Sequence, residues 1–154
     1  MQKRFIELVT AFLDEAGIQC PIIPGEHIVT VPLGDFAINI GLLEAQKAIV
    51  MQGVVGISPA SGREALYAEL LGMNSLFKGS QGATFGLEGD SVTLQTIIFM
   101  EALTQEAFTA QSLAFLEALA SALEGFNAVV ERARNAAPES PANDLLAMQN
   151  MIRV

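Results

Sequence analysis

The sequence predicts an α+β fold in which helices pack against an antiparallel sheet. Three stretches place apolar residues at the spacing of an amphipathic helix, and five others are rich in the β-branched or alternating apolar residues of strands. Short turns join the first three predicted strands, which therefore form an antiparallel meander. The predicted order is helix, three strands, helix, two strands, helix, and runs of strands between helices are typical of the α+β class.

The first predicted helix lies before Gly17, a residue type that commonly follows the last turn of a helix. Cys20-Pro21 and Pro24-Gly25 then indicate irregular chain. The apolar residues of this helix follow the i, i+3, i+4, i+7 pattern: Phe5, Leu8, Val9, Phe12, Leu13 and Ala16.

Three strands are predicted next, over residues 27–31, 36–42 and 48–57. The first is rich in β-branched residues and is followed by the turn Gly34-Asp35. The third is apolar at both alternating sets of positions except at Gln52, which is typical of a strand in the middle of a sheet or covered on both faces. The second has the clearest strand pattern, with four apolar residues that alternate with small or polar ones: Phe36, Ile38, Ile40 and Leu42.

The segment 61–87, SGREALYAELLGMNSLFKGSQGATFGL, predicts a helix, a glycine-rich turn and a strand. Ser61 and Glu64 have the spacing of a capping box at the start of a helix over residues 63–77. A strand over residues 83–87 follows the glycines. The helix is apolar over more than the strip that its own sheet requires, so part of it is expected to face something else: Leu66, Tyr67, Leu70, Leu71, Met73 and Phe77.

A fifth strand, over residues 92–100, is separated from the fourth by the turn Glu88-Gly89-Asp90. Thr104 is the predicted cap of the last long helix, and Glu106 in its first turn interacts favourably with the helix dipole. The apolar stripe of this helix fades near Arg134 and contains Phe108, Phe115, Leu119, Leu123, Phe126 and Val130.

The predicted domain covers residues 1–135, and residues 136–154 form a linker and a short segment. The linker contains Pro138 and Pro141, which disfavour helix at the residues before them. The segment after it carries apolar residues at helical spacing, and so short a helix needs a surface to lie on. We expect it either to dock on apolar surface of its own protein or to be an ordinary frayed terminus. Its apolar residues are Leu145, Met148, Met151 and Ile152.

The composition favours a protein-binding function. The 154 residues suffice for one domain with a substantial core, and 51% of them are hydrophobic against 16% charged, which predicts apolar surface reserved for a partner. The net charge of −9, with eight scattered basic residues, argues against nucleic acid because the field repels phosphate. This charge favours a basic or neutral protein segment, or serves only to keep an apolar protein soluble.

The sequence also bears on location. We predict no membrane span, because polar residues such as Gln52, Gln111 and Glu117 interrupt the apolar stretches. The N-terminus carries Glu7 within an amphipathic pattern and does not resemble a signal peptide. The single cysteine, Cys20, excludes an internal disulfide framework and is typical of a reducing cytoplasm.

The sequence predicts neither catalytic residues nor a metal or cofactor site. The single histidine, His27, has no nucleophile motif near it, and one His and one Cys seven positions apart are a poor metal-ligand set. The turn Gly79-Ser80-Gln81-Gly82 follows a helix and precedes a strand, whereas a phosphate-binding loop precedes a helix. We therefore expect a protein that is not an enzyme.

The pattern LLGMNSLF, then KGSQGATFGLEGD, then a second apolar strand, resembles the class I type III secretion chaperones of the Tir-chaperone family. The order of the predicted elements also resembles that family, over the first four-fifths of the chain. The resemblance implies a cytoplasmic bacterial homodimer that binds the non-globular N-terminal segment of a secreted effector and keeps it unfolded. The alternative is a small α+β ligand-binding or regulatory domain without a secretion role.

Two sets of site residues follow. The resemblance implies that the helix over residues 63–77 and the short strand after it form the homodimer contact, with Leu66, Leu70, Met73, Asn74 and Phe77 as its residues. An extended client would pair with an exposed sheet edge and place apolar side chains in grooves beside the first helix. The candidate client-binding residues are Phe5, Ile28, Thr30, Phe36, Ile38 and Ile40.

Overall fold

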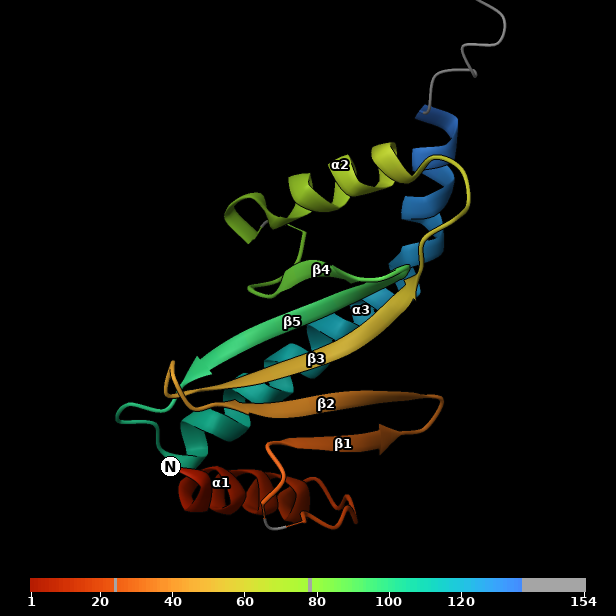
Figure 1. Cartoon of the computed structure of the whole chain (residues 1–154). Helices are drawn as coiled ribbons and strands as arrows, with labels where there is room; N and C mark the ends of the chain where they lie inside the picture. The colour runs from red at the N-terminus through yellow and green to blue at the C-terminus, as the bar shows by residue number, and fades with distance from the viewer. Residues whose placement is uncertain (24, 78, 137–154) are drawn as a thin grey trace, which may run out of the picture.

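The computed structural model describes residues 1–23, 25–77 and 79–136. It confirms the predicted α+β class and order of elements (Figure 1). The elements are α1 (Gln2–Glu15), β1 (Ile28–Leu33), β2 (Phe36–Leu43), β3 (Ala48–Ile57), α2 (Arg63–Asn74), the 3-10 turn η1 (Ser75–Phe77), β4 (Thr84–Glu88), β5 (Ser91–Phe99) and α3 (Gln105–Ala136).

The five strands form one antiparallel sheet in the order β1-β2-β3-β5-β4. β3 is central, as its apolar pattern predicts. Strands β3 and β5 are neighbours in space although α2 and β4 separate them in the chain, so β1 and β4 are the two edges. In Figure 1, α3 lies behind the sheet, α1 lies at its β1 end and α2 at its β4 end.

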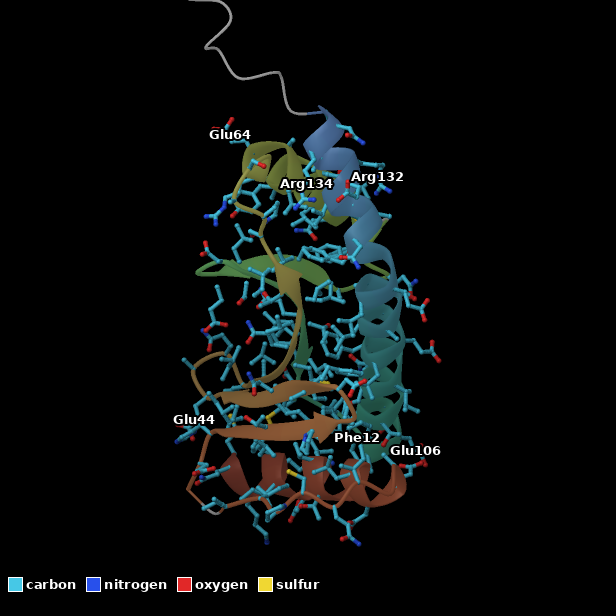
Figure 2. All side chains as sticks on the ribbon, turned by 90° about the vertical axis from the view of Figure 1, so that its right-hand side faces the viewer. Phe12, Glu44, Glu64, Glu106, Arg132 and Arg134 are labelled. Carbon is cyan, nitrogen blue, oxygen red and sulfur yellow. The ribbon has the colours of Figure 1, made fainter. Side chains whose placement is uncertain are left out.

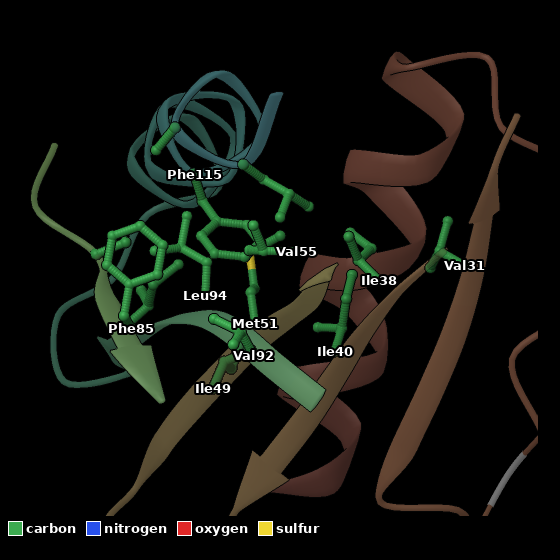
Figure 3. Packing of buried hydrophobic residues seen from close by; sticks show 14 of the residues in the cluster. Val31, Ile38, Ile40, Ile49, Met51, Val55, Phe85, Val92, Leu94 and Phe115 are labelled. Atoms are coloured by element: carbon green, nitrogen blue, oxygen red, sulfur yellow. The ribbon is translucent and has the colours of Figure 1, made fainter. Parts of the chain in front are cut away.

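One face of the sheet is buried against α1 and α3. Alternate strand residues such as Ile38, Ile40 and Met51 point into this core (Figure 3). Phe5 and Phe12 of α1 belong to the same buried cluster. The ring of Phe12 meets that of Phe108 edge to face, with centroids 6.0 Å apart. This pair joins α1 to the first turns of α3, and the β1 end of the sheet lies beside α1.

Close packing between α3 and β3 depends on two glycines of β3. A Cβ atom on Gly53 would lie 2.5 Å from Leu119 Cδ2, and one on Gly56 would lie 2.2 Å from Phe126 Cε1. Real Cβ atoms do not approach other atoms so closely, so any side chain there would push α3 away from the sheet. The helix can therefore run directly across the central strand.

One predicted helix cap and one predicted helix end are wrong, and a second predicted cap is confirmed. Gly62, in the left-handed conformation with φ 76°, is the N-cap of α2, and no side chain caps it, so the Ser61–Glu64 capping box is absent. The helix ends at Asn74 and not at Phe77. Thr104 does cap α3, because the Ala107 N–H donates to Thr104 Oγ1 at 3.2 Å.

By length and composition, α3 is the one helix in the described part of the chain that could cross a membrane. α3 meets these two measures although Gln111 and Glu117 interrupt its apolar stretch, and they do not by themselves show that it spans a membrane. Its apolar stripe packs against the sheet and α2, which is the arrangement of a core helix in a globular protein. The buried apolar residues of α3 are Phe108, Phe115, Ala118, Leu119, Phe126, Val129, Val130 and Ala133.

Candidate functional site

The titratable residues do not form a chemical site among residues 1–23, 25–77 and 79–136. His27 is about half exposed, and its Nδ1 lies 3.9 Å from Glu44 Oε1 on the surface. In the same described ranges, no three His, Cys, Asp or Glu side chains gather where they could hold a metal ion. The surfaces that remain as candidate sites are apolar, and their chemistry is that of protein binding.

The first candidate surface is a groove of about 350 Å³ between α2 and β4, hereafter the α2–β4 groove. Leu71 of α2 is 69% exposed and Leu87 of β4 is 49% exposed, so large aliphatic side chains border it on both sides. Such apolar area, left open by its own chain, is typical of a protein interface. Its lining residues are Tyr67, Leu70, Leu71, Asn74, Phe85, Gly86 and Leu87.

The apolar surface continues past the end of α2. Leu76 and Phe77 are 81% and 54% exposed, and both have positive φ, at 53° and 54°. Two consecutive non-glycine residues in this conformation are strained by about 1–3 kcal/mol each. The chain thus turns sharply here and presents two large apolar side chains to solvent.

The predicted dimer residues divide between the core and this surface. Leu66 and Leu70 are buried in the protomer's own core, at 0% and 4% exposure, whereas Phe77 is exposed and Met73 is intermediate. Leu71, which in the sequence only widens the apolar stripe, is far more available to a partner than Leu70. Leu87 lies two residues after Phe85 in β4 and so shares its face of the strand, which could have identified Leu87 as a further groove residue.

Asn74 has a structural role within the protomer. Its Nδ2 donates to the Phe85 carbonyl oxygen at 3.0 Å, and its Oδ1 accepts from the Phe85 N–H at 2.7 Å. Both bonds use backbone groups of β4 that point away from β5. Asn74 therefore closes the β4 edge of the sheet at Phe85, and its amide is not free for a partner.

The β1 edge is open by comparison. The Leu42 N–H donates to the His27 carbonyl oxygen at 2.7 Å, so alternate residues from His27 onward direct their backbone groups towards β2. Ile28 and Thr30 consequently direct N–H and C=O groups towards the free edge, and Pro32 directs only a C=O. The contact that the protomer itself makes with these groups is weak, because the donor to the Thr30 carbonyl is the Cys20 thiol, at 3.4 Å, and a thiol is a weak hydrogen-bond donor.

A groove of about 380 Å³ runs beside this open edge, between β1 and the chain that precedes it. Ile23 and Ile28 are 55% and 58% exposed on it. A strand added to β1 would thus find backbone partners and apolar contacts together. The lining residues are Gln19, Cys20, Pro21, Ile23, Glu26, Ile28, Val29, Thr30 and Pro32.

The candidate client-binding residues are also divided. Phe5, Ile38 and Ile40 are 0–1% exposed, and the core of the protomer itself encloses them, so the structure offers no client contact there. Ile28 and Thr30 are exposed at the β1 edge, and Phe36 is partly buried. Alternation identified which residues share a face of the sheet, but not which face the helices cover.

The face of the sheet opposite α3 is not covered by a helix in Figure 1. Ile28, Gly41, Val50 and Ile97 lie opposite one another in register and form an apolar row across four strands. The next row is polar and uncharged, and crosses all five strands: Thr30, Asn39, Gln52, Gln95 and Thr84. Ile28 thus joins the β1 edge to a neutral surface that suits an extended polypeptide.

The comparisons with known proteins agree with this geometry. The crystal structure of the ExsC–ExsE complex superposes with a TM-score of 0.66 at 15% identity, covering 80% of this chain and 94% of that one. The HopA1–SchA chaperone–effector complex gives 0.60 at 15% identity, covering 80% and 98%. YbjN from E. coli gives 0.59 at 18% identity, covering 79% and 91%.

At these low identities, the superpositions show a shared fold alone. No curated protein matches the chain in sequence. The sequence pattern of the Tir chaperone protein (CesT) family, in contrast, matches residues 8–123, which include the open β1 edge and the α2–β4 groove. This chain is a member of the CesT family of Tir chaperone proteins.

Proposed function

We propose that this protein is a type III secretion chaperone that binds the non-globular N-terminal segment of a secreted effector in the bacterial cytoplasm. The client segment pairs as an added strand with β1, where Ile28 and Thr30 direct backbone groups outward and only the Thr30 carbonyl has a contact, the weak one from Cys20 Sγ. This open edge, beside a groove that exposes Ile23 and Ile28, carries the proposal, because the β4 edge is closed at Phe85 by Asn74. The chaperone keeps the segment unfolded and competent for secretion, without a catalytic step or a cofactor.

The chemistry of the edge indicates the kind of segment that fits. Backbone pairing gives affinity that is independent of sequence, and alternate side chains give specificity. The two rows of the open sheet face that include Ile28 and Thr30 are uncharged, the groove beside β1 carries Glu26, and the whole chain has a net charge of −9. A neutral or basic segment with alternating apolar residues therefore fits best, and the ordering cost of an extended client keeps binding releasable.

A homodimer formed through the α2–β4 groove is part of the proposal. The support is the exposure of Leu71 and Leu87, which line the groove, and of Leu76 and Phe77, which follow the end of α2. The β1 edge lies at the opposite side of the sheet from β4. A dimer joined at α2 and β4 would therefore leave both client edges accessible.

A proline substitution at Thr30 tests the client site. Thr30→Pro removes an N–H that points away from β2, so the hydrogen bonds between β1 and β2 remain while an added client strand loses one. Proline is compatible with this edge strand, because Pro32 is already part of β1. Thr30→Val is the matched control, because it keeps this N–H and loses only the bond from Thr30 Oγ1 to Asn39 Oδ1. The measurements are co-purification from the native cytoplasm and titration with the N-terminal segment of the captured polypeptide.

We expect wild type and Thr30→Val to retain one polypeptide per dimer. A correctly folded Thr30→Pro should bind the client segment at least about tenfold more weakly, because the loss of one hydrogen bond costs about 1.5 kcal/mol of binding free energy. Equal binding by Thr30→Pro would contradict the β1 site. The alternative function, a ligand-binding or regulatory domain, predicts purification without any stoichiometric polypeptide.

A further inference from the structure

A second open strand edge lies at the C-terminal end of β5. The pairing of β4 with β5 ends at Thr84 and Gln95, whereas β3 stays paired with β5 as far as Phe99. In Figure 1, β5 accordingly extends past the start of β4. Among the described residues, no other segment is hydrogen-bonded to the backbone of residues 97–99 on the β4 side. These three residues form an edge that is called the β5 edge below.

The hydrogen-bond pattern gives the direction of the backbone groups at the β5 edge. The Met100 N–H donates to the Lys47 carbonyl oxygen at 2.9 Å, so alternate residues counted back from Met100 direct their backbone groups towards β3. Ile97 and Phe99 consequently direct their N–H and C=O groups away from β3. Their side chains are 51% and 66% exposed, on the face of the sheet opposite α3. A strand added at this edge would therefore find backbone partners and apolar contacts together.

A cleft of about 190 Å³ lies on the other face of the β5 edge, between β5 and α3. Thr96 lines it from β5, on the same face as the buried Ile98, and Gln111 and Ala114 line it from α3. None of the described residues that line the cleft carries a charge. The middle residue of an added strand would direct its side chain towards this cleft, and the two flanking side chains would lie on the opposite face. The site thus fits an extended stretch with apolar, uncharged and apolar side chains in that order.

We propose that the β5 edge binds a second stretch of the same client segment that pairs with β1. The proposal rests on the proposed function, because it requires a client. Ile28 at the β1 edge and Ile97 at the β5 edge belong to one row of the sheet, joined through Gly41 and Val50. Strands added outside β1 and β5 would be about 24 Å apart, a distance that about eight residues of extended chain span. The client can therefore follow this apolar row from one edge to the other.

The size of the β5 edge favours a tethered segment over a second copy of the chain. Three paired residues bury far less than the roughly 1,200 Å² of the smallest stable interfaces. Their weak pairing becomes effective once the client is held at β1, because the second contact is then intramolecular. Figure 2 shows α3 running from α1, where Glu106 lies, to α2, where Arg132 lies. Gln111 and Ala114 follow soon after Glu106, so the cleft and the α2–β4 groove lie along different parts of α3.

Amide hydrogen exchange resolved by NMR tests the β5 edge residue by residue. The probe is the N-terminal segment of the polypeptide that co-purifies with the wild-type protein. We expect this segment to slow exchange of the Ile97 and Phe99 amides at least about tenfold, because both N–H groups gain a partner. The Ile28 and Thr30 amides report the β1 edge in the same experiment. The Ile98 amide is the internal reference, since its N–H is directed towards β3 with or without the client.

The four outward amides separate failure of this proposal from failure of the proposed function. Slower exchange at Ile28 and Thr30 alone would overturn the β5 site and leave the β1 site standing. Slower exchange at Ile97 and Phe99 alone would support the β5 site and refute the β1 site. No change at either pair, or no captured polypeptide, would refute both. Slow exchange at Ile97 and Phe99 before the client is added, increasing with protein concentration, would overturn the proposal in favour of a second copy.

A proline at Ile97 provides an independent test. Ile97→Pro removes an N–H that the pairing of β3 with β5 does not use, and Ile97→Val is the matched control that keeps it. Slow exchange of the Ile98 amide shows that the variant is folded; if it is not, the wild-type exchange experiment decides. We expect Ile97→Pro to bind the client segment about tenfold more weakly than Ile97→Val. Equal binding by the two folded variants would overturn the proposal.

Discussion

At the residue scale, adjacent side chains of α2 have different roles. Leu70 is buried in the core while Leu71 is 69% exposed, although both belong to the same apolar stripe in the sequence. Asn74, one turn further on, uses its amide to bind Phe85 of β4 and not a partner. One helix thus contributes to the core, to the closure of a sheet edge and to an interaction surface.

The Asn74–Phe85 contact predicts a specific loss of stability. Asn74→Ala removes two hydrogen bonds from partly buried backbone groups, which should lower the free energy of unfolding by about 1–3 kcal/mol. Asn127→Ala is the matched control at an exposed helix position in α3, with an expected change within about 0.5 kcal/mol. Urea denaturation measures both. Similar losses for the two variants would contradict the role assigned to Asn74.

At the element scale, the contact between α3 and β3 sets the shape of the molecule. Gly53 and Gly56 let the helix approach the central strand, and neither has a positive φ, so their requirement is space and not an unusual backbone. Long aromatic and aliphatic side chains of α3 fill that space. The position of α3 in turn brings its last turns beside Gly62 and α2.

Alanine substitutions at two glycines should have opposite effects. Gly56→Ala forces the ring of Phe126 to move, which should destabilise the fold by about 1–3 kcal/mol. Gly72 lies within α2, and a Cβ atom added there would meet nothing within 4 Å, so Gly72→Ala should stabilise the helix by roughly 0.5–1 kcal/mol. Thermal and urea unfolding measure both changes. Stabilisation by Gly56→Ala would show that α3 does not pack as closely as described.

At the scale of the whole molecule, two apolar surfaces lie at opposite edges of one sheet. The β1 edge combines unpaired backbone groups with the groove beside Ile23 and Ile28. The β4 edge is closed at Phe85 and is bordered by the exposed side chains of Leu71 and Leu87. The first surface suits an extended segment and the second a folded apolar partner, so the proposed client and the proposed second copy would use separate surfaces.

The dimer prediction is best tested at Leu71. Leu71→Asp would bury a carboxylate without a partner in the interface, at a cost of at least about 3 kcal/mol, and should give a folded monomer. Leu113→Asp is the matched control, because Leu113 is an exposed leucine of α3 at 47%. Leu70→Asp is unsuitable, since Leu70 also belongs to the core. Light scattering at micromolar concentration should find dimers for wild type and Leu113→Asp; a stable Leu71→Asp dimer would refute this interface.

The sequence by itself determined the class, the order of elements and much of their extent, because periodicity records which residues share a face. The predicted limits of the third strand, residues 48–57, agree with β3, and Thr104 caps α3 as expected. The family was also apparent from the pattern LLGMNSLF and the glycine-rich turn after it.

Only the tertiary structure decided which of two apolar sets faces the core and which faces a partner. Ile38 and Ile28 both have the pattern of strand residues, yet helices cover one and solvent reaches the other. The bond between Asn74 and Phe85 joins residues eleven positions apart, and no local pattern encodes it. The physical reason is that burial depends on where whole elements pack, whereas periodicity reports only the geometry within one element.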